Sequence, residues 1–260
     1  MPARPDLKRY DLFGWDYEGL NPLKPGEAQW YELWARRTGG PVLGLACGTG
    51  RLLCHLARAG FETVGLDLSE TMCSLACGNI SALPQDVQAR VQVVQADMSR
   101  FDLGRQFGLI FVADNSLREL QTRAEIRSCL RCIRWHLTPG GVALVTERRF
   151  DPALYAGGAR VFDWSPPRDC PEAGGRVSRR VEVALSPDRQ TIAGTMRYKI
   201  IRGDGRETVE NCPFEAPAIS VDQFVELFSA AGFAVEACAG YREEPDDGKD
   251  PTVCFVCNMV

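Results

Sequence analysis

Short apolar runs alternate with amphipathic stretches in the first half of the chain, which predicts strands alternating with helices. Val42–Leu45 has the length and composition of a buried strand. From Arg51 the apolar residues recur at helical spacing, and a second apolar run, Thr63–Leu66, follows. Residues 91–98 alternate, and 107–114 are continuously apolar, as expected for a central strand covered on both faces. This order is typical of an α/β fold with a parallel sheet.

The segments around these strands predict further helices. Residues 27–37 have helical spacing, with Trp30, Leu33 and Trp34 on one stripe. Ser69 is a plausible N-cap for a helix that follows the second strand. The amphipathic stretch 125–137 predicts a third helix. The sequence Leu-Thr-Pro-Gly-Gly at 137–141 then indicates a turn into a strand over 142–147.

The pattern changes at residue 151. Short alternating runs over 151–217 are separated by turn-like sequences at 186–189 and 202–205, which predicts a small antiparallel sheet. Residues 220–232 then predict a helix that is capped by serine and ends at a glycine. Two strands, within 234–241 and 252–259, close the pattern.

The turn after the first strand carries the strongest chemical signal. Gly48 and Gly50 allow a ligand to approach bare backbone, and the second strand ends on Asp67, whose carboxylate can accept both hydrogen bonds of a ribose diol. This combination predicts a nucleoside-binding half-domain. A dinucleotide fingerprint would need a third glycine where Leu53 stands, so a nicotinamide dinucleotide is disfavoured.

The stretch from Val42 to Gly50 resembles the first motif of class I S-adenosylmethionine-dependent methyltransferases, hydrophobic-hydrophobic-acidic-x-G-x-G-x-G. It departs twice, because Gly44 stands at the acidic position and Ala46 at the first glycine. In the family that acid helps to hold the methionine moiety. The resemblance implies a Rossmann-like, seven-stranded methyltransferase sheet whose last strand is antiparallel, with the small antiparallel β sheet inserted as a lid.

This resemblance organises the chain into three parts. Residues 1–40 form an N-terminal cap segment, 41–150 and 218–260 the Rossmann-like methyltransferase domain, and 151–217 the inserted lid. Ligands bind at the carboxyl ends of strands in open α/β sheets, so we expect the lid over that edge.

The family pattern also assigns cofactor contacts. Leu68 and Met72 match positions that sandwich the adenine, with core packing as the alternative. Asp97 resembles the residue that accepts a hydrogen bond from the adenine amino group, although it could merely cap a turn. Tyr10 and Tyr17 are candidates for a tyrosine near the sulfonium, with docking of the segment as the alternative. The expected cofactor-binding residues are Tyr17, Ala46, Cys47, Gly48, Gly50, Asp67, Leu68, Met72, Asp97, Met98 and Ala113.

Acceptor contacts are expected near the end of the fourth strand and in the lid. The sequence Asn-Ser-Leu-x-x-Leu from Asn115 is similar to N-methyltransferases that act on glycine or on amino sugars. Many of these carry histidine where Glu119 stands, so no base is carried over and the catalytic residue stays unknown. The candidate substrate residues are Tyr10, Asn115, Arg149, Trp164 and Arg197.

Composition narrows the class of protein. A formal charge of −4 gives no electrostatic reason to expect nucleic acid or an anionic membrane as partner. The N-terminal residues have no apolar signal region, and the 11 cysteines then suggest reduced thiols, so we expect a cytoplasmic protein. The pairs Cys129/Cys132 and Cys254/Cys257 are expected to pack in the core rather than bind metal or act in redox chemistry. Cys254 and Cys257 lie in a predicted strand, where their odd separation points them to opposite faces.

Two further residue types bear on the chemistry. His55 and His136 have structural explanations, and no metal-binding pattern stands out, so no metal is expected. A neutral amine needs only to lose a proton to solvent, whereas a hydroxyl usually needs a base or a metal. The sequence therefore predicts a methyltransferase that uses S-adenosylmethionine, releases S-adenosylhomocysteine, and acts on a small molecule, more readily at an amine nitrogen. An O-methyltransferase of a small metabolite and a degenerate nucleoside-binding protein remain alternatives, and the oligomeric state, monomer or homodimer, stays open.

Overall fold

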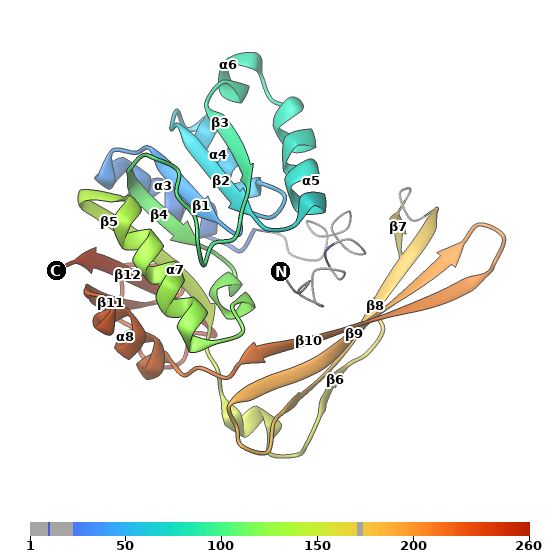
Figure 1. Ribbon diagram of the computed structural model, residues 1–260. Helices are drawn as coiled ribbons and strands as arrows, with labels where there is room; N and C mark the ends of the chain where they lie inside the picture. Colours follow the sequence, from blue (N-terminus) through green and yellow to red (C-terminus); the bar gives the residue numbers. More distant parts are fainter. Residues whose placement is uncertain (1–9, 11–22, 171–173) are drawn as a thin grey trace. The chain divides into compact units, whose positions relative to one another are not determined.

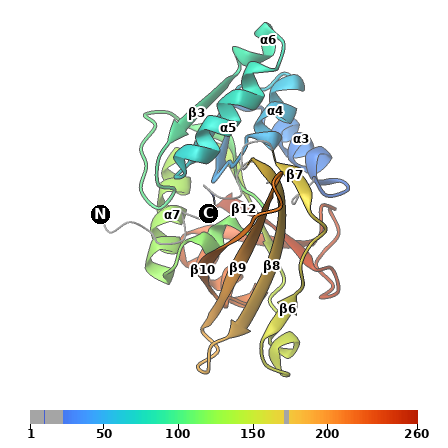
Figure 2. The same ribbon diagram turned by 90° about the vertical axis from the view of Figure 1, so that its right-hand side faces the viewer.

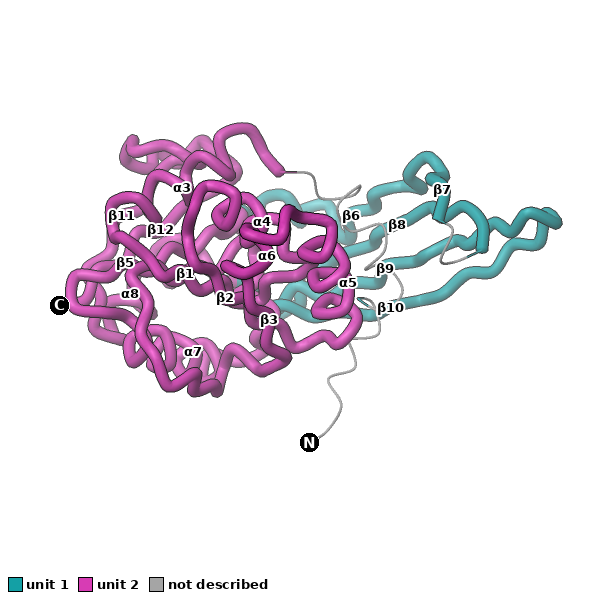
Figure 3. The backbone as a smooth tube through the Cα atoms, turned by 90° about the horizontal axis from the view of Figure 1, so that it is seen from above, with its two compact units in different colours: residues 1–21, 151–218 teal, residues 22–150, 219–260 magenta. Residues whose placement is uncertain are grey.

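A computed structural model describes residue 10 and residues 23–170 and 174–260; Tyr17 lies outside them. The chain divides into two compact units (Figure 3). The larger unit comprises Pro22–Phe150 and Ile219–Val260, and the smaller unit comprises Met1–Asn21 and Asp151–Ala218. The functional division into cap, methyltransferase domain and lid stays a prediction.

The larger unit contains a seven-stranded sheet with the order β11-β12-β5-β4-β1-β2-β3. Strands β1 to β5 run parallel, and β12 lies antiparallel between β5 and β11. The predicted Rossmann-like sheet with an antiparallel last strand is therefore confirmed. The strands are β1 (Val42–Leu45), β2 (Thr63–Asp67), β3 (Val91–Gln95), β4 (Phe107–Val112), β5 (Leu137–Arg148), β11 (Phe233–Ala239) and β12 (Thr252–Met259).

Helices cover both faces of this sheet (Figure 1). They are α3 (Glu27–Thr38), α4 (Arg51–Arg58), α5 (Glu70–Ser81), α6 (Gln85–Gln88), α7 (Arg123–His136) and α8 (Val221–Ala230), with a 3₁₀ turn η2 (Ser116–Glu119). Ser69 caps α5 as predicted, and Thr122 and Ser220 form capping boxes at α7 and α8. None of the helices in the described part of the chain has the length and apolar content to span a membrane.

Two apolar clusters lie on opposite faces of the sheet. The first is built from α7 and α8, and the second from α3 and α4. Cys257 belongs to the first cluster and Cys254 to the second. This confirms the expected opposite orientation of the two thiols, because side chains alternate along a strand.

Helix α4 lies close to the sheet because two strand residues are glycines. A Cβ atom on Gly65 would stand 2.2 Å from Leu53 Cδ1, and one on Gly44 would stand 3.1 Å from Leu53 Cδ2. Leu53 stands at the position of the third glycine in a dinucleotide fingerprint. Close packing of helix and strand is thus achieved by glycines on the strands, and the leucine fills the space above them.

Three boundaries differ from the sequence-based expectation. Strand β5 begins at Leu137 rather than at 142, because Leu137 already pairs with Phe107 before a register shift in β4. Strands β3 and β4 end at Gln95 and Val112, two or three residues early, and the chain then turns. Apolar composition continued past the last ladder residue in both strands, so it marked burial rather than pairing.

The smaller unit is an antiparallel sheet with the order β10-β9-β8-β6, and β7 also pairs with β8 (Figure 2). Its elements are η3 (Pro152–Tyr155), β6 (Arg160–Phe162), β7 (Arg168–Cys170), β8 (Gly175–Leu185), β9 (Thr191–Arg202) and β10 (Glu207–Pro217). Both expected turns join its long strands. Tyr198 is buried in its core with Cys170, Val177 and Cys212, and Tyr10 packs against this cluster.

Candidate functional site

The turn after β1 is built from residues in the left-handed region. Ala46, Gly48 and Gly50 have φ values of 48°, 56° and 76°. Gly50 also starts α4, and a Cβ there would stand 3.3 Å from the Cβ of Ala76 on α5. This turn brings backbone amides to the carboxyl end of β1, where a nucleoside would bind.

Asp67 holds this turn from the end of β2. Its Oδ2 accepts a hydrogen bond of 2.8 Å from the amide of Gly48, and its Oδ1 accepts one of 2.9 Å from the amide of Ser69. Burial raises the pKa of the carboxyl group, and the two amides oppose this rise. An ionised carboxylate oxygen accepts more than one hydrogen bond. Asp67 can therefore organise the turn and still accept hydrogen bonds from the two hydroxyls of a ribose diol.

The residues expected around the adenine lie close to the same edge. Asp97 caps a turn, since its Oδ1 accepts from the amide of Ser99 at 2.8 Å and from the Ser99 hydroxyl at 2.7 Å. Met98 is 6% exposed and belongs to the first apolar cluster, so core packing accounts for it. Met72 is buried in α5, and Leu68 is half-buried. Their adenine contacts stay predictions.

Two residues after β4 adopt a strained backbone. Asp114 and Asn115 have φ values of 53° and 66°, which costs non-glycine residues of order 1 kcal/mol each. Asn115 is held by β5, because its amide donates to the Thr146 carbonyl at 3.0 Å and its side-chain oxygen accepts from the Arg148 amide. Ala113 is half-buried against the second apolar cluster. This loop is thus fixed at the carboxyl end of β4.

Four charged side chains gather beside this loop, and we name them the charge cluster: Lys24, Glu27, Arg51 and Asp114. Lys24 Nζ donates to Asp114 Oδ1 at 2.8 Å. The Arg51 guanidinium lies 3.6 Å from Asp114 Oδ2 and 3.7 Å from Glu27 Oε1. The sequence pattern did not indicate this cluster, because its residues lie in three separate segments that only the fold brings together.

A second buried ion pair stands at the end of β5. The Arg118 Nε donates to Glu147 Oε2 at 2.7 Å, and Arg118 also donates to the carbonyls of Arg148 and Ile219. Burial raises the pKa of Glu147 to about 7, although Arg118 opposes the rise. These contacts fix η2 and the start of α8 to β5, and the carboxyl is only 2% exposed.

The candidate acceptor residues are divided between the two units. Asn115 and Arg149 belong to the larger unit, and Tyr10, Trp164 and Arg197 to the smaller. The Arg149 guanidinium donates to an Asp246 oxygen and to the Asp250 carbonyl. Lys199 Nζ lies 4.9 Å from the centre of the Trp164 ring, and Arg197 pairs with Glu182 at 3.2 Å. Their roles toward an acceptor stay predictions.

Both histidines have structural partners. The His136 ring accepts from the Leu103 amide at 3.0 Å and contacts the Cys132 carbonyl at 2.8 Å. His55 pairs with Glu32 at 2.9 Å. These contacts agree with the structural interpretation of both rings.

The cysteines form no disulfide with one another in the described part of the chain. Burial raises the pKa of Cys254 to about 12 and that of Cys73 to about 11, so these thiols stay protonated at neutral pH. No group of three or more potential ligand side chains that could hold a metal occurs within residues 23–170 and 174–260.

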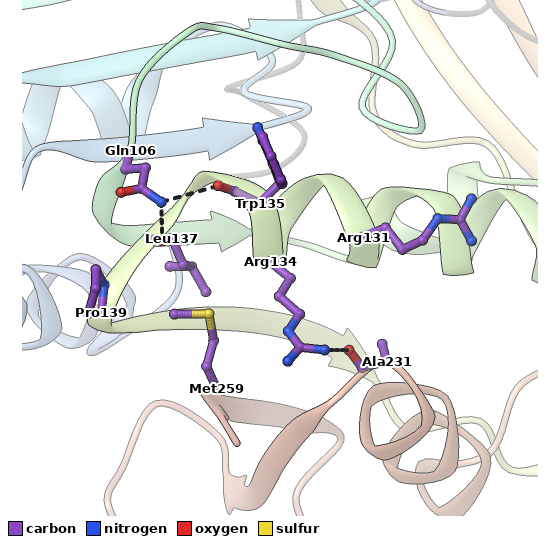
Figure 4. Close-up of a pocket in the computed structure, with 8 residues that line it drawn as sticks. All are labelled: Gln106, Arg131, Arg134, Trp135, Leu137, Pro139, Ala231 and Met259. Atoms are coloured by element: carbon purple, nitrogen blue, oxygen red, sulfur yellow. Dashed lines mark hydrogen bonds between the residues drawn. The ribbon is translucent and has the colours of Figure 1, made fainter.

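A separate pocket of about 410 Å³ lies at the opposite edge of the sheet (Figure 4). It is lined by Gln106, Arg131, Arg134, Trp135, Leu137, Pro139, Ala231 and Met259. Gln106 precedes β4 and Leu137 begins β5, so the pocket is at the amino ends of these strands. Ligands of open α/β sheets bind at the carboxyl ends, and this pocket is therefore not the expected cofactor site.

Comparisons with known proteins agree on one family. Residues 42–141 match the family model described as "Methyltransferase domain". The dTDP-4-amino-2,3,4,6-tetradeoxy-D-glucose N,N-dimethyltransferase of Saccharopolyspora spinosa is 30% identical over 201 residues, covering 76% of this chain and 73% of that protein. The dTDP-3-amino-3,6-dideoxy-alpha-D-glucopyranose N,N-dimethyltransferase of Streptomyces fradiae is 27% identical over 76% of this chain and 72% of that protein. The structure of Streptomyces venezuelae DesVI superposes with a TM-score of 0.71 at 25% identity, covering 96% of this chain and 97% of that one.

Proposed function

Since the chain belongs to the class I S-adenosylmethionine-dependent methyltransferases, we propose that it methylates an amine nitrogen of a small molecule, an amino sugar first among the acceptors. The similarity to amino-sugar N,N-dimethyltransferases carries the choice of nitrogen. Both imidazoles have structural partners, since His136 has a partner at each ring nitrogen and His55 Nε2 pairs with Glu32.

The turn after β1 and the end of β2 fit the cofactor. Left-handed backbone at Gly48 and Gly50 presents amides without side chains in the way, and Asp67 stands beside them with acceptor capacity left. We assign the ribose to Asp67, the adenine to the region of Leu68, Met72, Asp97 and Met98, and the methionine moiety to the ends of β1 and β4. The Ala46–Gly50 turn and Ala113 would line this path.

Bound S-adenosylmethionine supplies a methyl group already activated by its sulfonium. The chain's own contribution is to orient the acceptor in line with that methyl group and to exclude water. The fixed loop at Asp114 and Asn115 provides a rigid edge for this purpose. An amine acceptor loses its proton to solvent, so no general base is required of the protein.

The acceptor class is supported by two observations. The relatives described above are named as enzymes that dimethylate amino sugars linked to dTDP. The smaller unit carries many arginines on its strands, including Arg160, Arg168, Arg179, Arg197 and Arg202. Guanidinium groups bind phosphate oxygens in a bidentate manner. A sugar carried by a nucleoside diphosphate suits such a sheet.

A paired acceptor assay tests this proposal. The protein is incubated with S-adenosylmethionine and either a dTDP-linked amino sugar or the same nucleotide sugar with a hydroxyl in place of the amine; glycine is a third acceptor. We expect S-adenosylhomocysteine and a methylated product with the amino sugar and not with its hydroxyl counterpart. Methylation of the hydroxyl compound alone would refute the nitrogen assignment, and turnover of glycine alone would refute the sugar assignment.

A further inference from the structure

Position 44 has no space for the acid that the methyltransferase motif usually carries there. A Cβ on Gly44 would stand 2.6 Å from Cζ and 3.0 Å from Cε2 of Phe111, which lies opposite it on β4. Real Cβ atoms essentially never approach other heavy atoms so closely. The Phe111 ring therefore fills the volume beside the strand. Any carboxylate that serves the same site has to come from another element.

Helix α3 packs on this ring and carries a carboxylate one helical turn from the contact. Tyr31 of α3 packs on Phe111 with ring centres 4.9 Å apart, and its hydroxyl is hydrogen-bonded to Thr146 at 2.6 Å. Glu27 lies one helical turn before Tyr31, on the same face of α3. Both residues are 0% exposed. The face of α3 that covers the Gly44–Phe111 pair thus carries an acidic side chain at its amino-terminal end.

Glu27 has a buried oxygen that lacks a donor. Its Oε2 accepts from the backbone amide of Lys24 at 2.9 Å. Its Oε1 is buried and has no hydrogen-bond partner in the described part of the chain. The Arg51 guanidinium, at 3.7 Å, supplies positive charge but lies beyond hydrogen-bond distance. Native proteins rarely leave a buried carboxylate oxygen in this state, so it indicates a missing donor group.

A second oxygen nearby is in the same condition. The Tyr241 hydroxyl is buried without a partner among the residues that the structure describes. Tyr241 packs on Tyr31 with ring centres 6.4 Å apart, and its Cβ is 3.7 Å from where a Cβ on Gly26 would be. Two acceptors without donors therefore flank the start of α3. A group with several N–H donors and a positive charge is of the kind that such acceptors bind.

We propose that Glu27 replaces the acid absent at position 44 and binds the ammonium group of the cofactor's methionine moiety. The inference rests on the proposed function, because it assumes that S-adenosylmethionine binds this chain. An ammonium group has three donors and no acceptor, which matches the unpaired oxygens. Asp114, at the end of β4, places the charge cluster at the edge assigned to the methionine moiety. Glu27 is a binding residue in this assignment and takes no part in the transfer.

The test compares three thioether ligands by calorimetric titration. They are S-adenosylhomocysteine, its analogue without the amino group, and its analogue without the carboxyl group. Wild-type protein should bind the desamino analogue about 10- to 100-fold more weakly than S-adenosylhomocysteine, as expected for a charge-assisted hydrogen bond. Glu27→Gln should weaken S-adenosylhomocysteine and the decarboxylated analogue by the same factor. It should leave the desamino analogue within twofold of wild type.

A matched control is available on the same helix. Glu32 pairs with Arg36 at 2.6 Å and with His55 at 2.9 Å, away from the charge cluster, so Glu32→Gln should leave all three affinities unchanged. Thermal unfolding of each variant reports on folding. If Glu27→Gln does not fold, the wild-type comparison of S-adenosylhomocysteine with its desamino analogue decides, because equal affinities refute the ammonium site without any variant.

Three results would overturn the inference. Equal weakening of all three ligands by Glu27→Gln would show a structural role. Weakening of S-adenosylhomocysteine but not of its decarboxylated analogue would mean that Glu27 only positions Arg51 for the carboxylate. Unchanged affinities would remove Glu27 from the site. If wild-type protein binds neither S-adenosylmethionine nor S-adenosylhomocysteine, the proposed function itself fails and the inference with it.

Discussion

Gly44→Ala should lower the free energy of unfolding by about 1–3 kcal/mol, the usual cost of adding a methyl group to a filled core. The new Cβ would stand 2.6 Å from Phe111 Cζ and 3.1 Å from Leu53 Cδ2. Ordinary carbon contacts lie at about 3.5–4.0 Å, so the ring would have to move by about 1 Å. Phe111 is 2% exposed and packs against Tyr31, which leaves it little room to withdraw.

Urea unfolding followed by tryptophan fluorescence measures this loss, because Trp30 is buried in the same cluster. With a slope of about 2–3 kcal/mol/M, the urea concentration at the midpoint should fall by about 0.3–1.5 M. Gly78→Ala is the matched control. Gly78 lies within α5 and a Cβ there meets nothing within 4 Å, so alanine should raise stability by about 0.5–1 kcal/mol.

A double variant locates the cause. Phe111→Leu removes the ring, so combining it with Gly44→Ala should cost at least about 1 kcal/mol less than the sum of the two single changes. A free energy of unfolding of Gly44→Ala within about 0.5 kcal/mol of wild type, with Gly78→Ala behaving as expected, would mean that the Phe111 ring moves aside at little cost. The steric explanation would then be wrong.

The remaining predictions concern two carboxyl groups. Asp67→Ala should weaken S-adenosylmethionine binding at least about 100-fold in calorimetric titration, because two charge-assisted hydrogen bonds to the ribose contribute about 3–6 kcal/mol together; unchanged affinity would remove Asp67 from the site. Burial raises the pKa of Glu147 from 4.5 to about 7. Between these pH values the folded chain binds more protons than the unfolded chain, so the contribution of Glu147 to the free energy of unfolding falls as pH rises. The stability of wild type relative to Glu147→Gln should therefore fall between pH 5 and pH 8 in urea unfolding, and a relative stability independent of pH would show that Arg118 keeps the carboxylate ionised throughout.

Local pattern was sufficient for most elements of the larger unit. The apolar runs at β1, β2 and β4 and the serine caps of α5 and α8 are decided by neighbouring residues, and each was found in place. The odd spacing of Cys254 and Cys257 also predicted their opposite faces correctly. Boundaries were less predictable, because the start of β5 at Leu137 depends on its pairing with Phe107, which is distant in sequence.

The charge cluster could not be predicted for the same reason. Glu27 begins an amphipathic helix, where an acidic residue ordinarily interacts with the helix dipole in solvent. The predicted apolar stripe of Trp30, Leu33 and Trp34 also differs from the buried face of α3. That face contains Glu27, Trp30 and Tyr31, whereas Leu33 and Trp34 are only half-buried. The depth of Glu27 follows from how α3 packs on β4, and the loss of the acid at position 44 becomes intelligible only with the register that places Phe111 opposite Gly44.

The position of β12 has a consequence for how this chain is made. Within the sheet, β11 has β12 as its neighbour, and β12 joins it to β5. Residues 149–251 and then β12 itself must therefore leave the ribosome before β5 gains its partner on that side. Strand β11 also stays unpaired until β12 is made. Until then, β5 of a nascent chain has one open edge along its apolar run Val142–Val145, and such an edge is a template for pairing with other chains. The yield of soluble protein during synthesis should thus depend on how long this edge stays unpaired. In the folded enzyme the edge is covered by β12.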